Sequence, residues 1–126
     1  MKKLLIFTAL AEAATGVALL VVPSLVGRLL FGQEFTGITA VVARFAGIAL
    51  FTLGIACWLA RSDTPSRAAR GLVAAMFLYN IGVAALLAFA GVALGLRGIA
   101  LWPVVIIHLA MAVWCLPCLL FAPRHT

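Results

Sequence analysis

Four long apolar runs, separated by short polar stretches, dominate the pattern of hydrophobic and polar positions in this 126-residue chain. The runs cover about residues 4–22, 38–60, 71–94 and 101–121. Each run reaches the roughly 20 residues that an α-helix needs to cross the hydrocarbon layer of a bilayer. None shows the alternation of apolar and polar residues that marks the strands of a membrane β-barrel. The pattern therefore predicts an all-α integral membrane protein, a four-transmembrane-helix bundle formed by the single domain 1–126.

The connections between the runs are short and polar or turn-forming. Pro23 and Ser24 end the first run, because proline does not continue a helix from within. Residues 25–35 mix charged and amide side chains with Leu, Val and Phe, which is typical of a short amphipathic segment lying in the head-group layer. Residues 61–70 form a polar loop, and residues 95–98 form a tight turn.

The composition agrees with a bilayer as the solvent. Hydrophobic residues make up 67% of the chain and charged residues 10%, which is too apolar for so short a chain to bury in a water-soluble core. The formal net charge is +6, but the basic residues lie mostly at the ends of runs, where they contact anionic lipid head groups. We therefore expect membrane lipids as partners and no nucleic acid. Membrane-protein partners and a homo-oligomer stay open.

The distribution of Lys and Arg predicts how the chain is oriented. Two sets of basic residues face opposite sides of the predicted bundle: Lys2, Lys3, Arg61, Arg67, Arg70 and Arg124 on one side, Arg28 and Arg97 on the other. The positive-inside rule then places both termini in the cytoplasm, in a bacterial inner membrane. The first ten residues also resemble a secretory signal peptide, but we expect them to stay uncleaved as part of the first span.

Five polar side chains fall inside the runs, at similar predicted depths. They are Glu12 in the first run, Arg44 in the second, Tyr79 and Asn80 in the third, and His108 in the fourth. An isolated charge at the centre of a bilayer costs at least about 2.5 to 3.5 kcal/mol. The sequence therefore predicts that Glu12 and Arg44 face inward and pair, directly or through water, within a central polar cluster.

Two interpretations of this cluster stay open. In the functional one, Glu12, Arg44, Tyr79, Asn80 and His108 line a pocket for a proton, an ion or a lipid-like head group, because His108 can titrate near neutral pH. In the structural one, a hydrogen-bonded ion pair only fixes the helices relative to one another. No cofactor follows from the pattern, although a quinone or a lipid would suit such a pocket.

The last run contains a pair of cysteines, in the order Trp114-Cys115-Leu116-Pro117-Cys118. The order matches that of thioredoxin-like redox centres, which makes Cys115 and Cys118 candidate redox residues that exchange electrons with a quinone. However, the pair lies in the final turns of a predicted helix, where the dipole disfavours thiolate, and on the predicted cytoplasmic side, where thiols stay reduced. We favour a structural role, with Pro117 ending the helix. His125 is the only nearby extra ligand, so no metal site is predicted.

Small residues repeat at helical spacing within two of the runs. Ala43, Gly47 and Gly54 in the second run, and Gly91 and Gly95 near the end of the third, favour close helix packing inside the bundle. The sequence contains no phosphate-binding loop, nucleophile elbow or paired-carboxylate site. Without a complete catalytic constellation, enzymatic activity is not expected.

Several of these residues carry a resemblance to a known group of proteins. Thr15-Gly16 with Pro23-Ser24, and Ala43-Arg44-Phe45-Ala46-Gly47 followed by Gly54, resemble the small bacterial four-helix membrane proteins of the DoxX-like type and related families of unknown function. The resemblance covers most of the chain in architecture, through short motifs. It implies an accessory or redox-associated membrane protein and identifies no catalytic residue.

A second resemblance concerns the first run alone. Leu10-Ala11-Glu12 is similar to the site of small multidrug resistance transporters, in which a Glu of the first span couples protons to cationic drugs. Arg44 would neutralise such a site, and the long link from Pro23 to Gly37 departs from that family. Our leading hypothesis is therefore an accessory or lipid-like-ligand-binding module. The alternatives are a proton-coupled transporter using Glu12 and a thiol or quinone redox protein using Cys115 and Cys118.

Overall fold

The computed structural model describes residues 1–63 and 66–121 and contains five helices and no strand within them. Four of the helices are long and apolar enough to span a membrane. This confirms the predicted all-α four-transmembrane-helix bundle of a multi-pass membrane protein. The helices are α1 (Lys2–Val21), α2 (Pro23–Phe31), α3 (Gly37–Ala60), α4 (Arg67–Val92) and α5 (Leu101–Leu120).

A capping group and a proline explain why α4 and α2 begin earlier than the sequence pattern predicts. The Ser66 hydroxyl oxygen accepts a hydrogen bond of 3.1 Å from the amide of Ala69, so α4 begins at Arg67 instead of near residue 71. Arg70 is therefore helical, and its guanidinium donates to the carbonyl of Leu119 at the end of α5. Helix α2 begins at Pro23, because the fixed φ of proline suits the first helical position.

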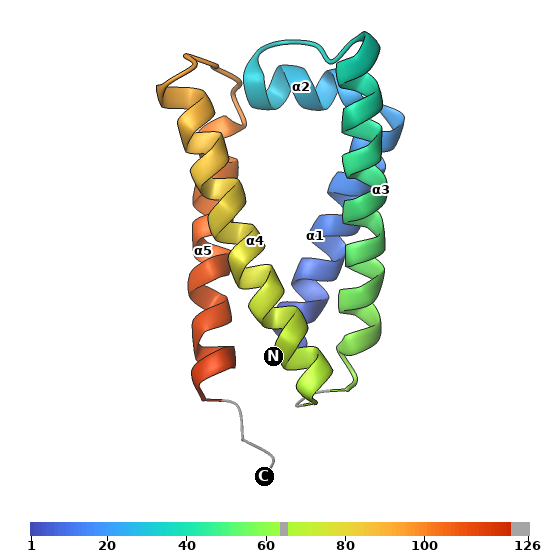
Figure 1. The fold of residues 1–126 in the computed structure, drawn as a ribbon, viewed down its shortest axis with the longest axis vertical. Helices are drawn as coiled ribbons and strands as arrows, with labels where there is room; N and C mark the ends of the chain where they lie inside the picture. The colour runs from blue at the N-terminus through green and yellow to red at the C-terminus, as the bar shows by residue number, and fades with distance from the viewer. Residues whose placement is uncertain (64–65, 122–126) are drawn as a thin grey trace.

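The helices pack as two pairs, α1 with α3 and α4 with α5 (Figure 1). Small residues let α1 and α3 approach at backbone distance, as predicted for Gly47 and Gly54. A Cβ atom on Gly16 would lie 2.6 Å from the backbone nitrogen of Phe51 and 2.7 Å from the carbonyl oxygen of Gly47. A Cβ atom on Gly54 would meet the backbone of α1 at 2.9 Å. This seam therefore depends on glycine.

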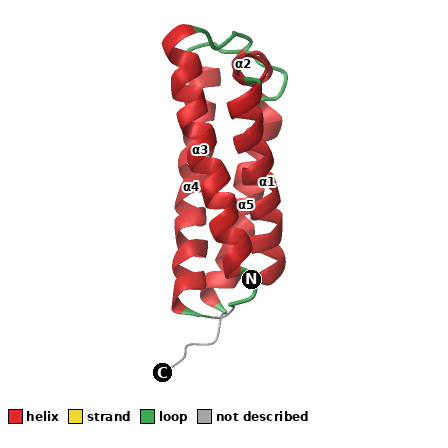
Figure 2. Cartoon of the chain, turned by 90° about the vertical axis from the view of Figure 1, so that its right-hand side faces the viewer, coloured by secondary structure: helices red, strands yellow, loops and turns green. Residues whose placement is uncertain are grey.

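The two pairs meet at one end of the molecule and separate toward the other (Figure 1). At the end where α1 begins, a hydrophobic cluster joins all four spanning helices. Its buried members are Leu4, Leu5, Ala9, Cys57, Val73, Met76, Met111 and Cys115. At the far end the pairs are spread apart, and α2 runs across the space between them, seen along its own axis in Figure 2.

Helix α2 is fastened at both ends of its crossing. Toward α5, the amide of Ala100 donates a hydrogen bond of 2.8 Å to the carbonyl of Leu29. Toward α3, the Ser24 hydroxyl donates to the carbonyl of Phe35 at 2.9 Å, and Arg28 forms an ion pair with Glu34. These contacts keep α2 across the wide end of the bundle, where it closes the space below it.

Candidate functional site

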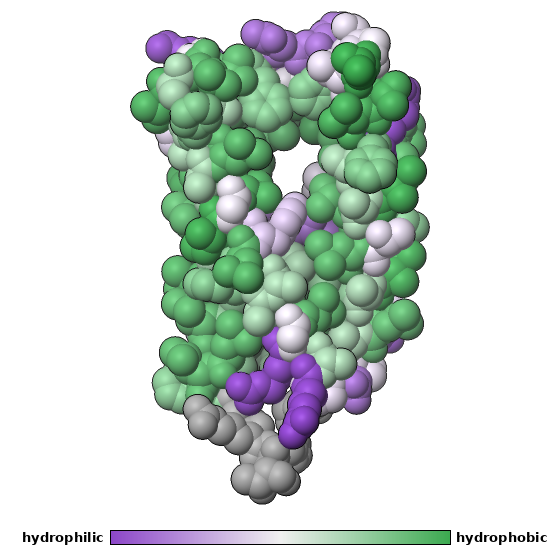
Figure 3. Space-filling model, in the orientation of Figure 1, coloured by the Kyte–Doolittle hydropathy of each residue, from purple (hydrophilic) through white to green (hydrophobic). Residues whose placement is uncertain are grey.

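A cavity of about 470 Å³ lies between the two helix pairs. Helix α2 covers one end of it, and the hydrophobic cluster closes the other. Figure 3 shows an opening in this region, bordered largely by hydrophobic residues, with more hydrophilic residues at its lower edge. The walls come from α1, α2, α4, α5 and Ala100, and α3 contributes no lining residue. The opening faces sideways, between helices that are long and apolar enough to span a membrane.

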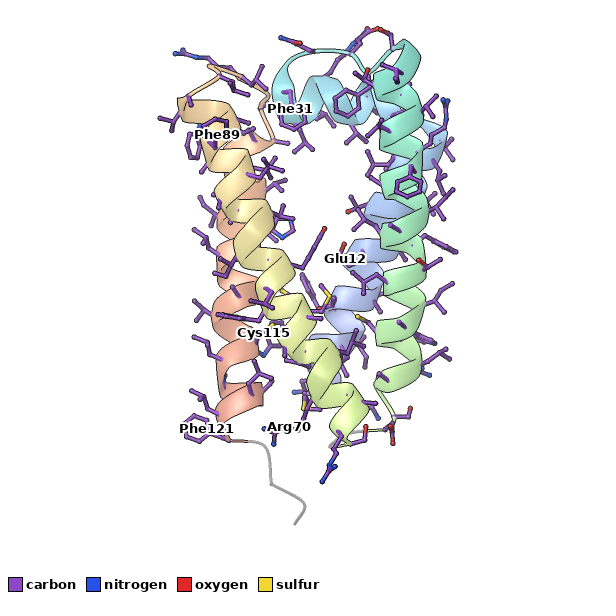
Figure 4. The ribbon with its side chains drawn as sticks, in the orientation of Figure 1. Glu12, Phe31, Arg70, Phe89, Cys115 and Phe121 are labelled. Carbon is purple, nitrogen blue, oxygen red and sulfur yellow. The ribbon has the colours of Figure 1, made fainter. Side chains whose placement is uncertain are left out.

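Glu12 and Tyr79 meet across this cavity. Glu12 projects from α1 into the space between the helix pairs (Figure 4) and is only 7% exposed. The hydroxyl of Tyr79, on α4, donates a hydrogen bond of 3.3 Å to Oε2 of Glu12. No cation lies within salt-bridge distance of Glu12 among residues 1–63 and 66–121. The tyrosine hydroxyl is therefore the side-chain partner that this carboxyl has in the bundle.

Asn80 and His108 form the second polar contact of the wall. Asn80 Nδ2 donates a hydrogen bond of 2.7 Å to the carbonyl of Met76, one turn earlier on α4. Asn80 Oδ1 lies 2.7 Å from Nδ1 of His108 on α5. The His108 ring also packs edge-on against Tyr79, with 5.7 Å between ring centroids. Glu12, Tyr79, His108 and Asn80 thus follow one another around the cavity as predicted, on three different helices.

Thr8 is a polar member of the cavity lining that the sequence analysis missed. Its side chain is 2% exposed, and its hydroxyl oxygen has no hydrogen-bond partner within the described part of the chain. Thr8 precedes Glu12 by four residues, so both lie on one face of α1. The spacing of four residues from Glu12 could have indicated that Thr8 faces the same cavity. A threonine in an apolar run is, however, easily interpreted as a residue that only packs against its neighbours.

The predicted pairing of Glu12 with Arg44 is wrong. Arg44 is exposed on α3, and its Nε donates a hydrogen bond of 3.1 Å to the carbonyl of Leu20 near the end of α1. It lies in a separate groove of about 430 Å³ that also includes Arg28 and Ser24. A long arginine side chain lowers its cost in a membrane by extending toward the head groups, and here that outweighs pairing with a carboxylate at greater depth.

The cysteines lie away from the cavity, in or beside the hydrophobic cluster. Cys57, Cys115 and Cys118 are free thiols, and Cys115 is fully buried. Cys57, on α3, belongs to the same hydrophobic cluster as Cys115. Pro117 does not end α5, which continues to Leu120. His125 and Arg124, considered above as a metal ligand and an orientation signal, lie outside the described residues.

Comparisons with protein-family models, with curated proteins and with solved structures give no match to this chain.

Proposed function

We propose that this protein binds a single-chain amphiphile of the bilayer in the cavity between its helix pairs. The observation that carries the proposal is a polar wall that includes Glu12, Tyr79 and His108, inside a largely apolar cavity at mid-span. A volume of about 470 Å³ falls in the range typical of small-ligand sites. An amphiphile would place its polar head against this wall and extend its chain through the lateral opening into lipid.

The energetics of the polar wall favour a ligand over a purely structural role. A structural staple would join the helices by a paired charge, but the ion pair predicted for that purpose does not form. Instead, Glu12 and Tyr79 leave hydrogen-bonding capacity directed at a space large enough for a guest. Polar groups facing hydrocarbon are costly unless they are satisfied, and a bound head group would satisfy them.

The cellular setting forms part of the same proposal. Lys2, Lys3, Arg61 and Arg67 gather at the end of the bundle where α1 begins, which supports cytoplasmic termini in a bacterial inner membrane. In that setting the protein would act as an accessory module of the DoxX-like kind, alone or with membrane-protein partners. Its ligand would then be a membrane lipid or a quinone in one of its two redox states.

Photo-crosslinking in lipid nanodiscs tests the proposal. We expect single-chain diazirine probes, with either an alcohol or a ketone head, to label cavity residues such as Ala11 and Ile107. Labelling should saturate and be displaced by the unlabelled compound, because a formed cavity holds a limited number of molecules. Non-saturable labelling confined to lipid-facing residues such as Phe45 and Ile48, which lie outside the cavity, would contradict it.

Proton-coupled transport is the second candidate, and the position of Arg44 favours it. The sequence suggested that Arg44 would neutralise Glu12, whereas the structure leaves the Glu12 carboxyl on the cavity wall without that cation. A carboxyl that exchanges a proton for a substrate requires this freedom.

For a transporter, Glu12→Gln is expected to abolish proton-driven uptake of a lipophilic cation into proteoliposomes, because the amide cannot exchange a proton. Asp63→Asn makes the same chemical change in the connection between α3 and α4 and should leave uptake intact. Undiminished proton-driven uptake by the Glu12 variant would rule out this mechanism.

A further inference from the structure

The orientation of Asn80 determines which nitrogen of His108 carries a hydrogen. The carbonyl of Met76 can only accept, so the Asn80 atom 2.7 Å from it must be the amide nitrogen. The amide oxygen then faces Nδ1 of His108, and an oxygen acceptor requires a hydrogen on that nitrogen. In the neutral ring, Nε2 is therefore an acceptor without a hydrogen.

The hydroxyl hydrogen of Tyr79 is also used in a hydrogen bond within the protein. This hydroxyl donates to Oε2 of Glu12, so when this carboxyl is ionised Oε1 is a second open acceptor. Nε2 of His108 has no partner within the described part of the chain. The cavity wall thus offers two acceptors, one from α1 and one from α5, whose usual partners would be donors on a guest molecule.

The other polar groups of the lining do not supply a competing fixed donor. The hydroxyl oxygen of Thr8 is buried, and the amide nitrogen of Asn80 already donates to the carbonyl of Met76. Thr15 is exposed in the cavity, but a hydroxyl rotates to donate or accept and does not discriminate between guests.

We infer that the cavity selects amphiphiles whose head group donates hydrogen bonds through hydroxyl groups: a hydroquinone, a phenol or an alcohol. This inference rests on the proposed ligand-binding function. A carbonyl head of the same shape would place its oxygen against Oε1 or Nε2, leaving acceptors facing acceptors. An uncharged hydroxyl also enters from hydrocarbon at far lower cost than an ammonium group, and the cavity opens toward hydrocarbon.

A hydroquinone and its quinone provide the matched pair for the test, because they share one carbon skeleton and differ in two hydrogens. Binding of a decyl-substituted benzohydroquinone and of the corresponding benzoquinone would be measured anaerobically on the full chain in nanodiscs. We expect the hydroquinone to bind at least about tenfold more tightly. Equal affinities, or tighter binding of the quinone, would overturn the inference and leave the proposed function standing. Binding of neither compound would overturn both.

Glu12→Gln separates this selection from a general loss of structure. The amide replaces an acceptor by a donor of the same shape, so the variant should lose hydroquinone affinity and gain quinone affinity. A misfolded protein would lose both. Asp63→Asn, at the opposite end of the bundle from α2, should keep the preference of the native protein. An unchanged preference in Glu12→Gln would show that Glu12 does not select the head group, and would contradict the inference.

Discussion

Gly16→Ala is expected to lower the free energy of unfolding by about 1–3 kcal/mol or more, because it places a methyl group inside a backbone contact. The new Cβ would lie 2.6 Å from the nitrogen of Phe51 and 2.7 Å from the carbonyl oxygen of Gly47. Both atoms belong to the main chain of α3 and cannot move aside like a flexible side chain. The helices must therefore separate, which loosens the most extensive helix–helix contact in the bundle.

Gly82→Ala is a closely matched control. Gly82 begins the same Gly-Val-Ala triplet as Gly16, but a Cβ atom on Gly82 would have no neighbour within 4 Å. Alanine at this exposed helical position should be neutral or stabilise by up to about 1 kcal/mol, because it restricts the unfolded chain. Thermal unfolding in one detergent, followed by circular dichroism, compares the two variants. Equal stability of both would show that α1 and α3 do not pack as described.

Ala11→Phe should weaken binding of an amphiphile in the cavity by at least about tenfold, the second large effect that we expect. Ala11 lines the cavity one residue before Glu12, and its side chain is exposed to that space. A phenyl ring there would occupy the volume that the proposal assigns to the ligand. Because the cavity already exists, the ring can enter it without displacing packed helices, so stability should fall little or rise.

Ala49→Phe introduces the same ring on the exposed surface of α3, which does not line the cavity. It should leave the affinity unchanged. Binding to both variants can be measured in nanodiscs by titration of a fluorescent single-chain alcohol. If Ala11→Phe bound the probe as tightly as Ala49→Phe, the ligand would not occupy the cavity.

A comparison of the polar residues shows how far depth along a helix can be predicted. Counting residues from the ends of the apolar runs placed Glu12, Tyr79, Asn80 and His108 at similar depth, and the structure brings them together. Depth depends only on the rise of 1.5 Å per residue, which is a local property of a helix. The rotation of each helix about its axis is not local.

Arg44 shows what that rotation decides. Its neighbour Ala43 is buried on α3 with Gly47, and consecutive residues on a helix differ by about a quarter turn or slightly more. Once the small residues of α3 face α1, Arg44 points away from the cavity and reaches the carbonyl of Leu20. Depth alone had suggested that Arg44 would meet Glu12.

The sequence by itself determined the four spans, because the apolar length needed to cross a bilayer is a property of each segment alone. Only the tertiary structure decided the separation of the helix pairs, the placement of α2 across their wide end and the cavity that results. Two of the three Gly-Val-Ala triplets, those that begin at Gly16 and Gly82, illustrate the reason. Gly16 packs against α3 and Gly82 has open space beside it, although the two residues that follow each glycine are the same. The reason is that packing depends on which residues of another helix lie against each position.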